Sequence, residues 1–225
     1  MLAVLFVLLF LAGGAWLGCM LLPGRRPLVR LYAGLSFGVL LMMWLPALWA
    51  YAVRFSYAAH WLSAATLLVL CALAWLLREK RPARPFDAKE ERLALDLLWM
   101  VVPLAILSGF LQYSHSIRPM ADGSYYVGQS TYGDLAMHMS FVTSLKNASF
   151  PPDYSLFPGM QLSYPFLMDS LSTSFYLFGW SIQAALVIPG TLMMALCYMG
   201  VMCLAREMTT GKKTVILAAL LFFLN

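Results

Sequence analysis

Long apolar runs divide this chain of 225 residues. A helix needs about 20 consecutive apolar residues to cross the hydrocarbon core of a bilayer. A last apolar run begins near Thr214 and continues to the end of the sequence, which predicts that the chain is the N-terminal part of a longer protein. We therefore expect an all-α, polytopic transmembrane protein. Runs of about the spanning length cover residues 1–22, 31–53, 61–77, 93–112 and 183–205.

Residues 113–182 form a long polar stretch between the fourth and fifth runs. Two amphipathic helices are predicted inside it, at about 134–147 and about 165–178, because apolar residues recur there at helical spacing. The second is apolar enough to suggest a span, but Phe166 to Phe178 covers only thirteen residues. A span needs at least about 17. We expect both helices to lie in the membrane interface.

The predicted organisation therefore has three parts. Residues 1–112 hold four transmembrane helices, and residues 113–182 form a large extracytoplasmic loop with the two juxtamembrane helices. Residues 183–225 hold a fifth transmembrane helix and the start of a sixth. No basic residue precedes Arg25, so the first run lacks the charged start of a signal peptide and is interpreted as a retained span.

Positively charged residues set the predicted orientation. Twelve of the fifteen Lys and Arg residues lie in the short loops 23–30, 78–92 and 206–213. Loops of this kind remain in the cytoplasm. We therefore predict a multi-pass protein of the plasma (inner) membrane, with these three loops cytoplasmic. The N-terminus and residues 113–182 are then outside. If 165–178 crossed the membrane, the last basic loop would face the wrong side.

Composition strengthens the membrane interpretation. The chain is 62% hydrophobic and 11% charged, whereas soluble domains are about a quarter charged. The net charge of +5 comes mainly from the orientation loops, so we expect the lipid bilayer as partner and no nucleic acid. The four cysteines lie inside apolar runs without metal-ligand spacing, which predicts buried free thiols.

Asp134 is the first candidate for chemistry, with His138 one helical turn later. A carboxylate at a helix start is either an N-cap, favoured by the free amides and the dipole, or a general base or metal ligand. His138 either orients or shares the proton of Asp134, or faces lipid headgroups. Asp96, close to the start of the fourth run, ranks low because it is near enough to the interface to reach water.

Four further residues are candidates for substrate binding. Arg118 and Lys146 are the only Lys or Arg residues in 113–182. A lipid-phosphate substrate would need one or both of them, because a phosphate leaving group requires a fixed positive charge. Ordinary contact with lipid headgroups explains the presence of these two cations equally well. Asp169 either marks the wet face of the second amphipathic helix or binds substrate together with the nearby Tyr164.

A longer pattern joins these residues. It begins with Tyr132-Gly133-Asp134 and an amphipathic helix, continues through a Pro-rich link, and includes an aromatic-Pro helix that ends in Leu-Phe-Gly at 177–179. A span with Pro189 near its outer end follows and finishes at Arg206. This pattern resembles the first outer loop and following span of the GT-C superfamily of membrane glycosyltransferases, which includes protein O-mannosyltransferases and aminoarabinose–lipid A transferases.

The resemblance implies transfer of a sugar from a polyprenyl-phosphate carrier to an acceptor on the non-cytoplasmic side. An acid in the first outer loop of the family acts as base or binds a metal, and here that acid is Asp134. Lys146 or Arg118 would stabilise the departing polyprenyl phosphate. The sequence departs from the family because four spans precede the loop instead of one. Leu135 also replaces a second acid found in some members, so a divalent metal cofactor has no support from the residues.

Two other classes remain open at the level of sequence. A transporter or flippase for a lipid-linked glycan would place polar groups deep within its spans. These spans are nearly free of charge, which favours chemistry at the membrane surface. The third class is a non-catalytic membrane assembly subunit. The sequence specifies neither the sugar nor the acceptor.

Overall fold

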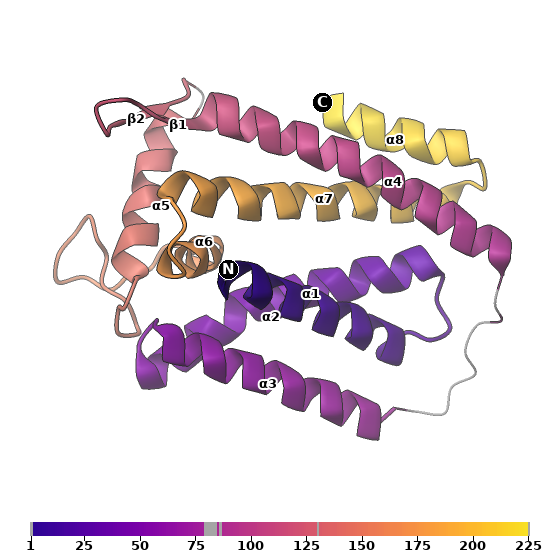
Figure 1. Cartoon of the computed structure of the whole chain (residues 1–225), viewed down its shortest axis with the longest axis horizontal. Coiled ribbons are helices and arrows are strands. Elements are labelled where there is room, and N and C mark those ends of the chain that lie inside the picture. The colour runs from indigo at the N-terminus through magenta and orange to yellow at the C-terminus, as the bar shows by residue number, and fades with distance from the viewer. Residues whose placement is uncertain (1, 79–84, 86, 130, 225) are drawn as a thin grey trace.

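The computed structural model describes residues 2–78, 85, 87–129 and 131–224. Within these residues the chain forms eight α-helices, one π-helical turn and one two-stranded antiparallel sheet (Figure 1). In chain order they are α1 (Leu2–Leu21), α2 (Pro27–Val53), α3 (Tyr57–Leu76), α4 (Ala88–Leu111), η1 (Gln112–Ser116), β1 (Ile117–Pro119), β2 (Tyr125–Val127), α5 (Tyr132–Leu145), α6 (Leu167–Leu177), α7 (Ile182–Met208) and α8 (Lys212–Leu224).

Five of the described helices are long and apolar enough to cross a membrane: α1, α2, α3, α4 with its π-helical extension, and α7. Their outward surfaces carry large apolar side chains, for example Trp99 at 73% exposure and Ile106 at 65%. Such an apolar surface is unfavourable in contact with water but favourable in contact with lipid tails. The chain is therefore a helical protein of the membrane type. α8 covers 13 residues.

Helices α1 and α2 approach each other closely because glycines line their contact. A Cβ atom on Gly14 would lie 2.4 Å from the carbonyl oxygen of Gly34, and one on Gly38 would lie 2.4 Å from that of Phe10. A Cβ atom on Gly18 would likewise lie 2.4 Å from the Arg30 carbonyl oxygen. Small residues four apart allow membrane helices to pack backbone against backbone.

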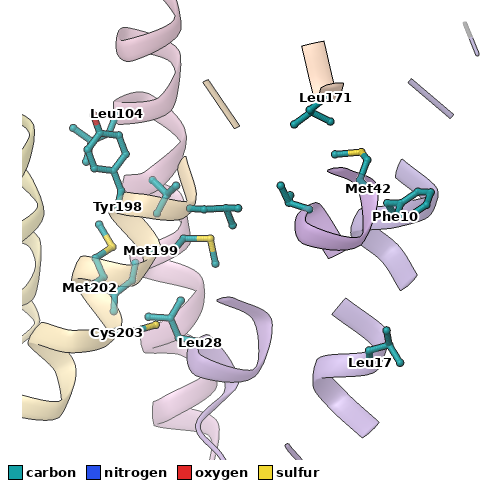
Figure 2. Packing of buried hydrophobic residues seen from close by; sticks show 14 of the residues in the cluster. Phe10, Leu17, Leu28, Met42, Leu104, Leu171, Tyr198, Met199, Met202 and Cys203 are labelled. Atoms are coloured by element: carbon teal, nitrogen blue, oxygen red, sulfur yellow. The ribbon is translucent and has the colours of Figure 1, made fainter. Parts of the chain in front are cut away.

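The core of the bundle joins side chains from distant parts of the chain (Figure 2). Tyr198 of α7 is fully buried, and its hydroxyl forms a 2.6 Å hydrogen bond with Ser108 of α4. This bond satisfies both polar groups inside the apolar bundle. All four cysteines are free, as predicted, but only Cys203 is buried, because Cys19 and Cys197 lie on outward helix surfaces.

The basic turns gather at one end of the bundle, where ion pairs join four helices. Arg206 of α7 lies 2.7 Å from Glu90 of α4, and Lys212 of α8 lies 2.7 Å from Asp96. Asp96 therefore has a structural partner. Two more pairs link Arg26 with Glu207 and Arg30 with Glu91. Lys80, Arg81 and Arg84, which also contributed to the orientation prediction, lie outside the described residues.

The opposite end of the bundle carries the β1–β2 hairpin, α5 and α6 (Figure 1). α5 is attached to the turn between α2 and α3 by two backbone hydrogen bonds. The Phe55 amide donates to the Ala148 carbonyl at 2.8 Å, and the Asn147 amide donates to the Phe55 carbonyl at 3.0 Å. The segment after α5 is thus fixed to the membrane-type helices.

α6 differs from the amphipathic helix that the sequence predicts. Asp169, Ser172 and Thr173 are buried along with Leu171 and Phe175. The expectation of a wet face is therefore wrong. Asp169 and Thr173 form hydrogen bonds to α5, which is how these polar groups become buried without a large energetic cost. In α5 the buried residues are Phe141, Val142 and Leu145, on the side that also carries His138.

Candidate functional site

Successive turns of α5 contact successive turns of α6. His138 hydrogen-bonds to Asp169, and the Thr173 hydroxyl donates to the Val142 carbonyl at 3.1 Å. One turn further, the Lys146 ammonium lies 4.8 Å from the centre of the Tyr176 ring, a cation–π contact. His138, Val142 and Lys146 are each four residues apart, so they lie on one face of α5. Asp134 begins the same series.

The His138–Asp169 pair is the most clearly built polar feature of this face. The His138 Nδ1 atom lies 2.9 Å from Asp169 Oδ1 and 3.1 Å from Oδ2. An ionised carboxylate only accepts hydrogen bonds, so Nδ1 must carry the proton. In the neutral ring, Nε2 then has a free lone pair. The rings of Phe141 and Tyr164 flank the imidazole at 6.1 and 5.8 Å between centres.

The two members of the pair differ in exposure. The Asp169 side chain is 5% exposed, whereas the His138 side chain is 32% exposed. Burial raises the pKa of Asp169 above its ordinary value, and the neighbouring His138 lowers it in part. A buried acid that orients a partly exposed histidine is a common arrangement in general base catalysis.

Asp134 lies one turn before His138 but does not pair with it. It is the third residue of α5, is exposed, and has no hydrogen-bond or ion-pair partner among the described residues. The N-cap position belongs to Thr131, whose hydroxyl donates to the Gly128 carbonyl at 3.2 Å. The N-cap interpretation of Asp134 is therefore wrong. The amide groups of the first helical turn still favour a negative charge there.

The two predicted cations occupy different places. Lys146 follows the last turn of α5, twelve residues after Asp134, which corresponds to about 18 Å along a helix. Arg118 lies on β1, with its guanidinium carbon 5.2 Å from the centre of the Tyr126 ring on the paired strand. The hairpin ends shortly before α5 begins. Arg118 is thus associated with the Asp134 end of α5, and Lys146 with the opposite end.

Tyr164 and Asp169 both lie at the site, and both contact His138. Asp169 binds Nδ1 of this ring at 2.9 Å, and the centre of the Tyr164 ring lies 5.8 Å from the centre of the imidazole. The sequence indicated the Asp134–His138 spacing but not the His138–Asp169 bond, which spans 31 residues. Among the described residues, no three His, Cys, Asp or Glu side chains gather closely enough to hold a metal ion.

Another histidine, His60, is buried and forms hydrogen bonds that the sequence did not predict. His60 of α3 is 2% exposed, with Nδ1 2.7 Å from the Ser56 carbonyl oxygen and Nε2 2.9 Å from the Ser174 hydroxyl of α6. Because a carbonyl only accepts, Nδ1 carries the proton. The Ser174 hydroxyl lies within hydrogen-bond distance of both His60 Nε2 and the Ser170 carbonyl oxygen, at 2.9 and 3.0 Å. The sequence shows only a histidine just before an apolar run, and this pattern does not identify the residue to which the histidine bonds.

These features define the chain as a helical membrane-type protein with a histidine–aspartate pair and an exposed acid at one end. No protein-family model, curated protein sequence or solved structure matches the chain. Its function must therefore be argued from the site.

Proposed function

We propose that the protein is a membrane glycosyltransferase that moves a sugar from a polyprenyl-phosphate carrier to an acceptor on the non-cytoplasmic side, with Asp134 as base. The observation that carries this proposal is the exposed carboxylate of Asp134, which has no partner among the described residues and lies one helical turn from the oriented His138. Both lie at the end of the bundle opposite the basic turns (Figure 1). In the orientation that those turns predict, this end faces outward.

In the proposed step an oxygen of the acceptor hydroxyl attacks the anomeric carbon of the sugar. A new carbon–oxygen bond forms, and the bond from that carbon to the polyprenyl phosphate breaks. The hydroxyl proton passes to the carboxylate of Asp134, and the bonding electrons leave with the phosphate. A neutral hydroxyl is a poor nucleophile and requires a base. The anionic leaving group is stabilised by a fixed cation, for which Arg118 is placed near the Asp134 end of α5.

His138 has a separate role in this proposal. Its Nδ1 proton is held by Asp169, so Nε2 accepts a hydrogen bond from a second, neighbouring hydroxyl of the acceptor and thereby positions the attacking one. Tyr164 forms one wall beside the ring. Two groups with free acceptor atoms then lie one turn apart on α5, an arrangement suited to binding a sugar or polyol hydroxyl.

The test compares sugar transfer by the full protein in membranes supplied with a pool of polyprenyl-phosphate sugars. General bases typically contribute about 10²–10⁴ in rate, so Asp134→Asn is expected to lower transfer at least about a hundredfold. Asp153→Asn is the matched control, because Asp153 is an exposed acid of the same polar stretch. It is expected to retain the wild-type rate.

Variants at His138 divide the roles further. His138→Gln is expected to raise the KM for the acceptor more than it lowers kcat if the ring only positions substrate. A loss in kcat as large as that of Asp134→Asn would identify the ring as the base. Transfer close to wild type in both variants would refute the proposal and favour the transport or assembly alternatives.

A further inference from the structure

A groove of about 650 Å³ opens beside the β1–β2 hairpin, apart from the contacts between α5 and α6. Its walls come from the π-helical turn, the hairpin and the segment that leads into α5. None of the lining residues is acidic, and several present hydrogen-bond donors. The lining residues are Ser114, His115, Arg118, Tyr126, Gly128 and Gln129.

Arg118 gives the groove a fixed positive charge. Its guanidinium group lies over the ring of Tyr126, directly across the hairpin. Such stacking holds the plane of the group while its N–H edges remain free to bind an oxyanion. Within the described residues no carboxylate pairs with Arg118. Asp122, the acid in the hairpin turn, instead accepts hydrogen bonds from the amide and hydroxyl of Ser124 at 3.0 and 2.7 Å.

His115 provides a second hydrogen-bond donor when both of its ring nitrogens carry a proton. The Ser114 hydroxyl donates its single proton to the Phe110 carbonyl at 2.6 Å. Its oxygen must therefore accept from His115 Nδ1, which lies 2.7 Å away. The Nε2 atom of His115 has no partner among the described residues. In the protonated ring this nitrogen is also a donor, on the same groove as the Arg118 guanidinium.

The groove is rigidly attached to the bundle. The Gln183 side-chain amide of α7 donates to the Ile117 carbonyl at 2.7 Å, and both residues are buried. A Cβ atom on Gly128 would lie 2.0 Å from the His115 carbonyl oxygen, so only glycine allows the end of the hairpin to approach the π-helical turn this closely. A preorganised set of donors binds an anion without a large ordering cost.

The position of the groove indicates which anion it meets. The adjacent end of α4 exposes Phe110 at 59%, as expected of a surface that faces lipid, and Tyr113 follows at 52%. Tyrosines gather where lipid tails give way to headgroups, and Tyr126 lies in the groove itself. We propose that this groove binds the phosphate of an anionic membrane lipid between Arg118 and His115. The proposed sugar transfer uses the same Arg118 for the leaving phosphate, so the two proposals share this residue, but lipid binding in the groove is measured without any transfer and fails or holds separately from it.

The test measures binding to the full protein in an uncharged detergent by native mass spectrometry. The probes are dioleoyl phosphatidic acid, dioleoylglycerol with the same chains but no phosphate, and inorganic phosphate. Hydrogen bonds to charged groups are the strong class. Arg118→Gln is therefore expected to weaken phosphatidic acid binding about tenfold or more, and His115→Gln by a smaller factor of a few. Dioleoylglycerol and inorganic phosphate are both expected to bind at least tenfold more weakly than phosphatidic acid.

Arg78→Gln is the matched control. The Arg78 guanidinium also stacks on an aromatic ring, 5.0 Å from the centre of Trp75, but it follows α3 at the opposite end of the bundle. The control is expected to stay within about twofold of wild type. Equal weakening by Arg78→Gln and Arg118→Gln would show diffuse charge attraction and overturn the site. Inorganic phosphate binding as tightly as phosphatidic acid would show a free-anion site, and unchanged binding in Arg118→Gln would show no site there.

Discussion

Replacing Gly14 with alanine tests the closest helix contact in the structure. The added Cβ atom would lie 2.4 Å from the Gly34 carbonyl oxygen and 2.6 Å from the Gly38 Cα atom. Ordinary van der Waals contact begins at 3.4 Å. Because the obstructing atoms belong to the backbone, they have no rotamer to adopt, and α1 and α2 must separate by about 1 Å.

The cost follows from this separation. A gap of 0.5–1 Å removes about a quarter to a half of each dispersion contact along the interface, and overpacking typically costs about 1–3 kcal/mol. Alanine also favours a helix over glycine by up to about 1 kcal/mol, which offsets part of the loss. We expect Gly14→Ala to lower the free energy of unfolding by about 2 kcal/mol net.

Two glycines of the same chain serve as controls in a denaturant titration of the purified protein in detergent. A Cβ atom at Gly133 would lie within 4 Å of no described residue beyond its own chain neighbours and helix turn, so the alanine variant is expected to be as stable as wild type or more stable. The three atoms nearest to a Cβ atom at Gly13 all belong to the flexible end of Leu67, the first at 2.9 Å, so alanine there is expected to have an intermediate effect. If Gly14→Ala proved as stable as Gly133→Ala, the close packing of α1 on α2 would be refuted.

Two further predictions concern polar pairs. Because burial raises the pKa of Asp169, the stability that its protonated form contributes is present at acid pH and lost as pH rises through the raised pKa. Thermal melts of wild type and Asp169→Asn across a pH series should therefore converge or cross with rising pH, and parallel curves would contradict the shift. Glu90→Gln should cost about 3 kcal/mol, because it leaves the largely buried Arg206 uncompensated. Asp96→Asn, which removes a solvent-screened pair, should cost much less than Glu90→Gln in the same titration.

The sequence was sufficient to predict the membrane-type helices because their signal is local. A run of about 20 apolar residues is its own evidence for a span, and the five helices of spanning length coincide with the five predicted runs. The first amphipathic helix was also placed well, since Tyr132–Leu145 overlaps the predicted 134–147. The hairpin and the π-helical turn were not predicted, because three-residue strands carry too short a pattern.

The partners of the polar residues were beyond the reach of local patterns. Periodicity shows that Asp169 and Thr173 share a face of α6 but not that α5 covers that face. The bond from His60 to Ser174 joins residues 114 positions apart. Such pairings depend on how α3, α5 and α6 meet, and a helix with two buried faces has the same sequence pattern as one lying at a wet interface.

The partners, once known, show which polar groups hold helices together. His60, Asp96 and Asp169 each form a hydrogen bond or ion pair that stabilises the contact between two helices. Asp134, in contrast, is exposed and has no partner within the described residues. Its replacement by asparagine breaks no contact among the described residues and loses only the favourable charge at the first helical turn, so stability should change by no more than about 1 kcal/mol. Any large loss of activity in that variant would therefore report on chemistry rather than on folding, which makes Asp134 the most informative residue of the site.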